Sequence, residues 1–286
     1  MIIAKSFAKI NLYLKVIGKR ADGYHLLESL MALIDVFDLI KIEKSNNFEL
    51  KIEGLNQQFL QQNWQDNIII KTFDLLSSHH HFSPNIKITL QKNIPIAAGL
   101  GGGSSNAACL MLMLNDFYQL GLGQKQLLDL GLKIGADVPF FLNALTTQKP
   151  IFVSGIGEIL ENCDKKLPNW HLLIINPNIP LSTQKIFSLF SKNDFCQNNF
   201  QNSDQEILTT IQNCNNDLQN EAIKIVPEIG LIINFAEKQK GCLLARMSGS
   251  GASCFVVFKD AKDAEICYKN FKTTFPNFYT NQSSFL

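Results

Sequence analysis

Hydrophobic and polar residues alternate along the first part of the chain with the two-residue period of β-strands. This alternation predicts strands over residues 2–7 (IIAKSF) and 10–17 (INLYLKVI) and, after the loop GKRADGYH, over 38–44 (DLIKIEK) and 48–54 (FELKIEG). A helical period follows from Asn67 to about Ser78, where Asp66 can cap the helix, before NIKITL returns to the strand pattern. The first part of the chain therefore mixes strands and helices.

Two further helices are predicted behind a glycine-rich segment, from about Ser105 to Gln119 and from about Gln124 to Ile134. Gly135 ends the second of them as a glycine C-cap. IFVSGIGEIL is predicted as a strand after these helices. The apolar face of the first helix carries Leu110, Met113, Leu114 and Phe117.

The sequence changes in character near residue 165, where LPNW precedes a strand pattern in HLLIINP. Residues 193–220 are rich in Asn and Gln, which favours a solvated loop and helix edge over a recognition or aggregation element. Helices are predicted from Pro227 to about Lys238 and from about Asp260, with a glycine turn between strand patterns in LLARMSGSGASCFVVF. We therefore predict two α+β domains, residues 1–165 and 166–286.

Charge and cysteine content exclude several classes of protein. The chain has 26 Lys and Arg residues against 25 Asp and Glu, a net charge of +1, so no general field attracts nucleic acid or a membrane surface. Its 7 cysteines are scattered without a C-x-x-C pair, which favours reduced thiols and a cytoplasmic location. No apolar run approaches the ~18 residues of a membrane span, and Lys5 and Lys9 interrupt the apolar N-terminus, unlike a signal peptide.

The segment PIAAGLGGGSSNAACLMLML, residues 95–114, joins a glycine-rich stretch directly to an apolar helix. Glycines let the backbone approach a ligand closely, and the first N–H groups and the dipole of a helix favour an anion. Ser104 and Ser105 add hydroxyl donors and an N-cap. The spacing fits neither a P-loop, because no Lys follows the glycines, nor a dinucleotide fingerprint. The segment predicts a phosphate site, with a glycine hinge that packs helix against strand as the alternative.

Three motifs in this order resemble the GHMP kinases, the small-molecule kinases of galactose, homoserine, mevalonate and related substrates. They are AKINLYLKVIGKRADGYHLLES, PIAAGLGGGSS and MSGSGASCF, with GADVPFF between the second and the third. RADGYH and the triple glycine resemble one branch in particular, whose acceptor is a cytidine-diphosphate derivative of methylerythritol. Ala97 and Ala98 depart from the family pattern, since relatives often carry glycine at these positions.

The resemblance implies a fold and a reaction. The fold is a two-domain α+β GHMP kinase fold, with an N-terminal domain like domain 2 of ribosomal protein S5 and a ferredoxin-like C-terminal domain. The reaction transfers the γ-phosphoryl group of ATP to the 2-hydroxyl of 4-(cytidine 5'-diphospho)-2-C-methyl-D-erythritol, in isoprenoid precursor biosynthesis. Mg²⁺ is expected to arrive with ATP and to have few protein ligands. We expect a monomer or weak homodimer without nucleic-acid or membrane partners.

Lys9 and Asp137 are the candidate catalytic residues. From their surroundings alone, an in-strand lysine usually reaches solvent and an Asp before Val-Pro is usually a turn residue, so these alternatives stay open. The resemblance implies instead that Asp137 takes the proton from the acceptor hydroxyl and that Lys9 positions it and stabilises the reacting groups. An ammonium there would stabilise the alkoxide that forms on the acceptor.

The same resemblance assigns the binding residues. Asn11, Tyr24, His25 and Phe187 are expected to bind the acceptor, with Tyr24 and His25 contacting the cytosine and Phe187 on its opposite face. A packed turn is the alternative for Tyr24 and His25, and the core face of a helix is the alternative for Phe187. Ser248, Gly249, Ser250 and Gly251 would form a third glycine motif that steadies the first, or a plain tight turn. The residues expected to bind ATP are Pro95, Ile96, Ala97, Ala98, Gly99, Leu100, Gly101, Gly102, Gly103, Ser104 and Ser105, with Asn67 near the adenine.

Two rival functions share these motifs. A GHMP kinase for homoserine or a mevalonate derivative would keep the glycine loops but lack the aromatic residues for cytosine. A non-catalytic nucleotide sensor or RNA-binding relative would keep the glycine loops but lose the catalytic base. Lys9 and Asp137 argue against the sensor, and the near-neutral charge weakens the RNA alternative. HHH at 79–81 has no suitably spaced Cys or carboxylate nearby, so we predict a solvated helix end and no metal site.

Overall fold

The computed structural model describes residues 1–190 and 207–286, which form parts of two compact units. Unit 1 comprises Met1–Ala8, Val36–Ile96 and Gly101–Gln148. Unit 2 comprises Lys9–Asp35, Ala97–Leu100 and Lys149–Leu286. Residues 193–206 of the Asn- and Gln-rich segment lie outside the described part of the chain, so the prediction of a solvated loop there stays a prediction.

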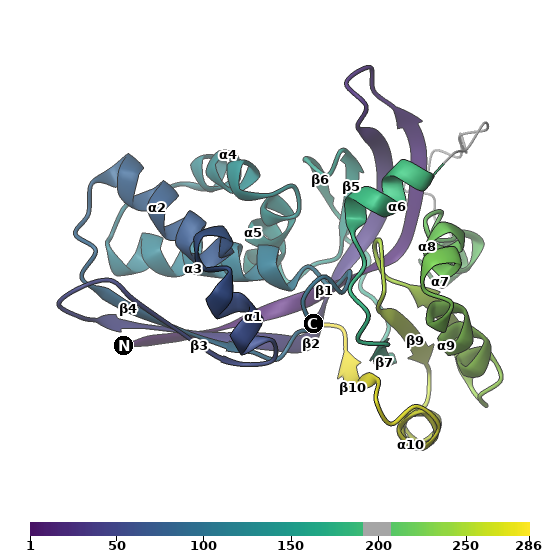
Figure 1. Ribbon diagram of the computed structural model, residues 1–286. Coiled ribbons are helices and arrows are strands. Elements are labelled where there is room, and N and C mark those ends of the chain that lie inside the picture. The colour runs from purple at the N-terminus through teal and green to yellow at the C-terminus, as the bar shows by residue number, and fades with distance from the viewer. Residues whose placement is uncertain (191–206) are drawn as a thin grey trace. The chain divides into compact units, whose positions relative to one another are not determined.

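Unit 1 contains a sheet with the strand order β3-β4-β2 (Figure 1). β2 (His25–Lys44) pairs antiparallel with β4 (Ile86–Lys92), and β3 (Glu49–Gly54) pairs parallel with β4. Every second side chain of β4 is buried, namely Ile86, Ile88, Leu90 and Lys92. This alternation gives the sheet one interior face and one face toward solvent.

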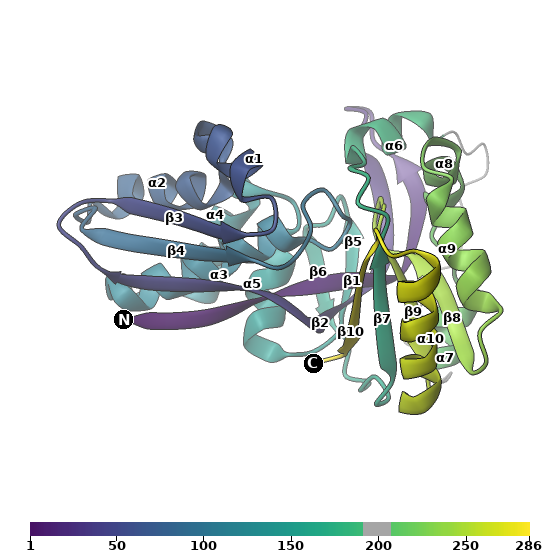
Figure 2. The ribbon, with the colours of Figure 1, turned by 60° about the horizontal axis from the view of Figure 1, so that its bottom comes forward.

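Helices cover the interior face of this sheet, as Figures 1 and 2 show. They are α2 (Ile68–His80), α3 (Gly102–Phe117), α4 (Gln124–Ile134) and α5 (Val138–Thr147), whereas α1 (Gln57–Gln62) and the 3-10 turn η1 (Trp64–Asp66) bury no residue. α3 packs against α2, α4 and α5 and buries Leu110, Met113 and Leu114, which confirms most of its predicted apolar face. The start of α3 is therefore held by a tightly packed helical layer.

Unit 2 contains an antiparallel sheet with the strand order β10-β7-β9-β8. Its strands are β7 (His171–Asn176), β8 (Cys242–Met247), β9 (Cys254–Phe258) and β10 (Tyr279–Ser284). Helices separate β7 from β8 and β9 from β10, which gives the β-α-β-β-α-β pattern of ferredoxin-like folds. The predicted α+β fold class is confirmed.

The helices of unit 2 are α6 (Thr183–Leu189), α7 (Ile207–Asn213), α8 (Gln219–Ile225), α9 (Glu228–Glu237) and α10 (Ala261–Thr274). Side chains of α9 and α10 pack on the sheet and form a core that includes Ile229, Ile232, Val256, Phe258 and Phe271. In residues 1–190 and 207–286, no helix has the length and hydropathy needed to cross a bilayer.

Two long strands pass from one unit into the other. β1 (Ile2–Lys19) is a single strand where the sequence predicts two, and β2 begins at His25, well before the predicted residue 38. In unit 2, β2 pairs with β5 (Ile151–Gly155), which pairs with β6 (Ile159–Asn162). The predicted single strand IFVSGIGEIL is therefore wrong, because a turn with Gly155 and Gly157 at positive φ divides it into two strands.

Candidate active site

The glycine loop contributes residues to both units, and hydrogen bonds within unit 2 hold Ala97–Leu100. The carbonyls of Ala98, Gly99 and Leu100 accept from Ser253 N at 3.1 Å, Ser248 Oγ at 3.0 Å and Lys9 N at 3.0 Å. Ala97 has a left-handed φ of 48°, which is costly for a residue with a Cβ atom. A glycine at this position would avoid that cost.

Gly99 is the point at which the glycine loop meets the third glycine motif within unit 2. Its φ is 73°, and a Cβ atom built on it would lie 2.3 Å from the carbonyl oxygen of Ser248 and 2.9 Å from that of Gly251. No side chain fits there without moving backbone atoms, so the position requires glycine. The structure thus brings two of the predicted motifs into direct contact.

The third glycine motif, residues 248–251, is a tight turn between β8 and β9 that a buried amide supports. Asn216 Nδ2 donates to the carbonyl oxygens of Met247 at 2.8 Å and Gly249 at 2.7 Å. Asn216 is 5% exposed. Sequence reasoning missed this residue because it lies in no motif and only the fold brings it to the turn.

Thr183 is a second residue that sequence reasoning missed. It is the first residue of α6, which Ser182 caps by accepting from Lys185 N. Its Oγ1 lies 2.7 Å from Ser250 Oγ in hydrogen-bonding contact. This contact ties the start of α6 to the third glycine motif.

Lys9 and Asn11 lie on β1 beside the third glycine motif and are joined by a short hydrogen bond. Lys9 Nζ donates to Asn11 Oδ1 at 2.6 Å, and Asn11 Nδ2 donates to Ser29 Oγ at 2.8 Å. A Cβ atom on Gly249 would lie 3.2 Å from Asn11 Oδ1 and 3.5 Å from Lys9 Nζ. Lys9 is only 4% exposed, so the alternative of a solvent-facing lysine is wrong. The buried ammonium has polar partners, as a charge in the interior requires.

In unit 1, helix α3 begins at Gly102, earlier than predicted, and glycine rather than serine caps it. Gly101 is the N-cap with a left-handed φ of 68°, and no side chain caps the helix. Ser104 and Ser105 therefore lie inside the helix, where Ser105 Oγ accepts from Ser6 Oγ at 2.8 Å. The first N–H groups of an α-helix have no partner within it and favour an anion.

Asp137 lies at the start of α5, in the turn that follows α4. It is the N-cap residue, with φ −83° and ψ −11°, but its side chain does not cap the helix. Pro139 sits in the first turn of α5, where its missing N–H is tolerated. A Cβ atom on Gly135 would lie 3.9 Å from Ser104 Oγ, so this turn neighbours the start of α3. Two candidate segments of unit 1 are thus adjacent.

Asn67 caps α2, whereas the sequence predicted Asp66 as the cap. Asn67 Oδ1 accepts from Ile69 N at 3.0 Å, because its backbone has the extended conformation of an N-cap and Asp66 lies in the preceding 3-10 turn. Its Nδ2 is buried and has no hydrogen-bond partner in the described residues. The next residue, Ile68, lies near the start of α3, since its Cδ1 is 4.0 Å from a Cβ atom built on Gly103.

Two of the residues predicted to contact the cytosine, His25 and Phe187, stack on each other in unit 2. The His25 and Phe187 rings are stacked with centroids 5.3 Å apart and an interplanar angle of 26°, and Phe190 meets His25 edge-on at 6.0 Å. Tyr24 is 61% exposed. Burial, with a smaller contribution from the charge of Lys19, lowers the pKa of His25. The neutral ring has one donor and one acceptor nitrogen. Phe190 was not predicted, since it matches no motif.

The described residues contain no group of three or more His, Cys, Asp or Glu side chains that could hold a metal ion. His79 and His80 lie in the last turn of α2, and His81 is its C-cap with a left-handed φ of 50°. The prediction of a helix end at this tract is confirmed.

Two family models match the chain. The model for the GHMP kinases N terminal domain matches residues 67–144, and the model for the GHMP kinases C terminal domain matches residues 198–277. A crystal structure of 4-(cytidine 5'-diphospho)-2C-methyl-D-erythritol kinase is similar with a TM-score of 0.79 and 25% identity, and the match covers 99% of each chain. A mevalonate kinase has the same fold, with a TM-score of 0.69 at 14% identity.

Curated relatives match over nearly the whole chain. The 4-diphosphocytidyl-2-C-methyl-D-erythritol kinase of Prochlorococcus marinus (strain MIT 9515) is 38% identical over 291 residues, covering 95% of this chain and 90% of its own. The protein of the same name from Ehrlichia ruminantium (strain Gardel) is 36% identical over 280 residues, covering 96% and 95%. The chain belongs to the GHMP kinases and, within them, to the 4-diphosphocytidyl-2-C-methyl-D-erythritol kinase family.

Proposed function

We propose that this chain transfers the γ-phosphoryl group of ATP to the 2-hydroxyl of 4-(cytidine 5'-diphospho)-2-C-methyl-D-erythritol, giving the 2-phosphate and ADP. The observation that carries the proposal is the arrangement within unit 2, where the glycine loop and the third glycine motif meet beside Lys9 and Asn11. This arrangement combines the backbone of a phosphate loop with a buried cation, which phosphoryl transfer requires. The relatives named for this reaction match almost the full length of the chain.

In the proposed step, the acceptor 2-oxygen forms a bond to the γ-phosphorus while the bond from that phosphorus to the β–γ bridging oxygen breaks. Asp137 receives the proton of the 2-hydroxyl, and the Lys9 ammonium offsets negative charge on the reacting oxygens. The short bond to Asn11 fixes the Lys9 ammonium, so little reorganisation is needed during the reaction. Mg²⁺ that arrives with ATP would supply positive charge to offset that of the phosphates.

The nucleotide is proposed to bind along residues 95–105. The N–H groups at the start of α3 would hold phosphate oxygens, because they have no partner within the helix. Asn67 Nδ2 is proposed to donate to a ring nitrogen of the adenine. Its burial without a partner supports this role, since buried donors are rarely left unpaired.

The cytosine is proposed to bind at Tyr24, His25 and Phe187. A neutral His25 can donate to or accept from the polar edge of the base, which carries both acceptors and an amino group. Because His25 already lies on Phe187, the base cannot enter between these two rings unless they separate. The exposed Tyr24 ring is free to stack on the outer face of the base.

The wider assignments are proposals that the sequence supports. We propose a boundary between the two domains near residue 165, and the gap between the residues that the two family models match supports it. The protein is proposed to work in the cytoplasm as a monomer or weak homodimer. The described cysteines Cys109, Cys163, Cys214, Cys242, Cys254 and Cys267 form no disulfide, which is consistent with a reducing compartment.

The experiment that tests the proposed function measures ADP formation by the purified protein with Mg-ATP and one of three acceptors. The acceptors are 4-(cytidine 5'-diphospho)-2-C-methyl-D-erythritol, homoserine and phosphomevalonate. Turnover with the cytidine compound alone is expected. Turnover with another acceptor would keep the fold and discard the cytosine site, and no turnover with any acceptor would favour a nucleotide sensor.

Tyr24→Ala is expected to raise the KM for the acceptor by about 5- to 150-fold, the equivalent of one lost base stack of about 1–3 kcal/mol. The KM for ATP should not change, because Tyr24 is assigned to the acceptor alone. Tyr24→Phe is the matched control and should keep a near-normal acceptor KM, since it retains the ring. Steady-state kinetics with each substrate varied in turn gives both constants. An acceptor KM that Tyr24→Ala leaves unchanged would remove Tyr24 from the site.

A further inference from the structure

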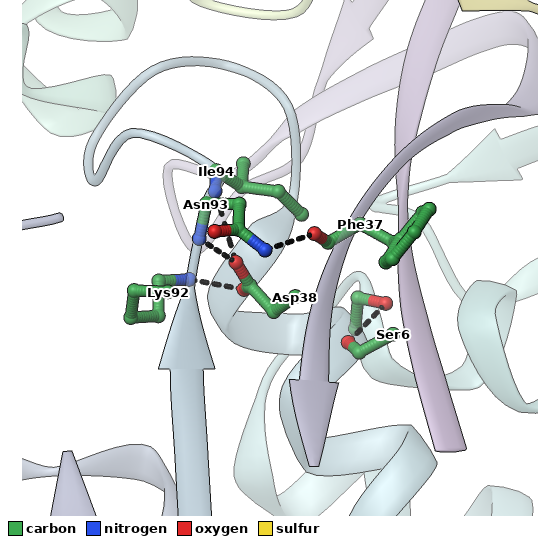
Figure 3. A network of polar contacts seen from close by, with 7 residues as sticks. Ser6, Phe37, Asp38, Lys92, Asn93 and Ile94 are labelled. Carbon is green, nitrogen blue, oxygen red and sulfur yellow. Dashed lines mark hydrogen bonds and ion pairs between the residues drawn. The ribbon is translucent and has the colours of Figure 1, made fainter. Parts of the chain in front are cut away.

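Two charged residues occupy core positions in the sheet of unit 1. Asp38 on β2 and Lys92 on β4 follow the same alternation as their apolar neighbours and are 0% and 3% exposed. Leu39 pairs with Gln91 in this antiparallel ladder, so Asp38 and Lys92 stand at the next cross-strand position. Their side chains form a buried ion pair, as Figure 3 shows.

Asp38 fixes the backbone at the point where β4 ends and the glycine loop begins. Its Oδ1 accepts from the backbone N–H groups of Asn93 at 2.7 Å and Ile94 at 2.9 Å (Figure 3). Asn93 Nδ2 donates to Phe37 O at 3.0 Å. A carboxylate thus takes over the hydrogen bonds that a neighbouring strand would otherwise supply.

Lys92 lies beside the first turn of α3. A Cβ atom on Gly102 would be 3.4 Å from Lys92 Nζ and 2.9 Å from Ile94 Cγ2, so glycine is what lets these side chains approach the helix. A cation at the N-terminus of a helix is unfavourable, because the dipole already places positive charge there. An anion bound at the N-terminus of α3 would interact favourably with both the helix dipole and the Lys92 ammonium.

The ion pair is not explained by stability alone. Removing two charges from water costs free energy that their attraction often fails to recover, and apolar residues of similar size frequently replace such pairs without loss. The positions are ones where the strand pattern itself calls for apolar side chains. Asp38 accepts two backbone N–H groups, which an apolar residue could not do, so the charge of Lys92 is the part that calls for a further role.

We propose that Asp38 and Lys92 are positioning residues for the ATP phosphates. Asp38 sets the exit of the glycine loop from β4, and the Lys92 ammonium, held against Asp38, places positive charge behind the first turn of α3. This inference rests on the proposed function, in which the ATP phosphates bind at the start of α3. Neither side chain touches the reacting atoms.

The test compares two double variants with the wild type. Asp38→Leu with Lys92→Met removes the pair without leaving a buried charge alone, and Asp38→Asn with Lys92→Met keeps an oxygen acceptor for the Asn93 and Ile94 amides but removes both charges. Lys51→Met with Glu53→Gln is the control, since it removes an exposed ion pair from a neighbouring strand. Calorimetry gives the Kd for Mg-ADP, thermal unfolding gives Tm, and kinetics gives both KM values.

Both core variants are expected to fold and to raise the Kd for Mg-ADP and the KM for ATP by about 3- to 30-fold, with an unchanged acceptor KM. The control should bind Mg-ADP as the wild type does. A normal Kd in a folded core variant, whatever its Tm, would show that the pair is merely structural and overturn the inference. A wild-type protein that binds no Mg-ADP would instead overturn the proposed function and this inference with it.

Discussion

Asp137→Asn is expected to lower kcat by about 10²–10⁴-fold, the contribution of a positioned general base. The Kd for Mg-ATP should remain nearly unchanged, because the substitution preserves the shape of the side chain and Asp137 is not assigned to the nucleotide. Helix α5 should also remain intact, since the Asp137 side chain does not cap it. Rapid-quench or steady-state kinetics gives kcat, and calorimetry gives the Kd.

Asp129→Asn is the matched control for this substitution. Asp129 lies on α4 with an exposed side chain, so its amide variant should have wild-type kcat and Tm. A near-normal kcat in Asp137→Asn would show that Asp137 neither accepts the proton nor orients the hydroxyl. A low kcat together with a large loss in Tm would mean that the residue is structural.

Gly99→Ala is expected to lower the free energy of unfolding by about 2–5 kcal/mol, as the sum of a left-handed alanine and an overpacked contact. Its Cβ would lie 2.3 Å from the backbone oxygen of Ser248. The position of a Cβ atom is fixed by its own backbone, so neither atom can move away by a side-chain rotation. The loop and the third glycine motif must therefore separate. Urea unfolding measures the loss, and the KM for ATP should rise with it.

Gly23→Ala separates the cost of a left-handed alanine from the cost of the overpacked contact. Gly23 lies in the same unit with a φ of 91°, but a Cβ atom built on it has no neighbour within 4 Å. It should therefore lose only the conformational part, about 1–2 kcal/mol. Equal losses in the two variants would contradict the close approach of Gly99 to Ser248.

Most of the correct predictions of helices, the glycine loop and the fold class rest on regular periodicity and short motifs. α4 has the predicted bounds, Gln124–Ile134, because its apolar period ends at a glycine that terminates the helix. The glycine loop before α3 was found because glycine, serine and an apolar helix follow one another directly. The α+β class followed from the mixture of the two periods, without knowledge of any contact between distant residues.

Buried polar residues account for the main errors. β1 continues through Ala8 and Lys9, where the sequence predicts a break between two strands, and Lys9 is buried with its ammonium bonded to Asn11. Helix α5 was not predicted, since Asp137 and Pro139 read as a turn although proline is tolerated in a first helical turn. Both cases depend on partners or positions that the local pattern does not contain.

Contacts between distant segments were beyond the sequence as well. The stack of His25 on Phe187 and the support of Gly249 by Asn216 join residues that are well separated along the chain. Asp38 and Lys92 were not predicted as a pair, because Asp38 begins one predicted strand and Lys92 lies two residues beyond the end of another. Only the register of β2 and β4 shows that they form a pair.

The most direct test of the account is the ³¹P NMR spectrum of the product formed from Mg-ATP and 4-(cytidine 5'-diphospho)-2-C-methyl-D-erythritol. Carbon 2 of this acceptor carries a methyl group and no hydrogen, so a phosphate on its oxygen has no proton on the attached carbon. The account predicts one new phosphomonoester signal without that proton coupling, in amounts equal to the ADP formed. A new signal split by protons of the attached carbon, or inorganic phosphate as the only new species besides ADP, would contradict it.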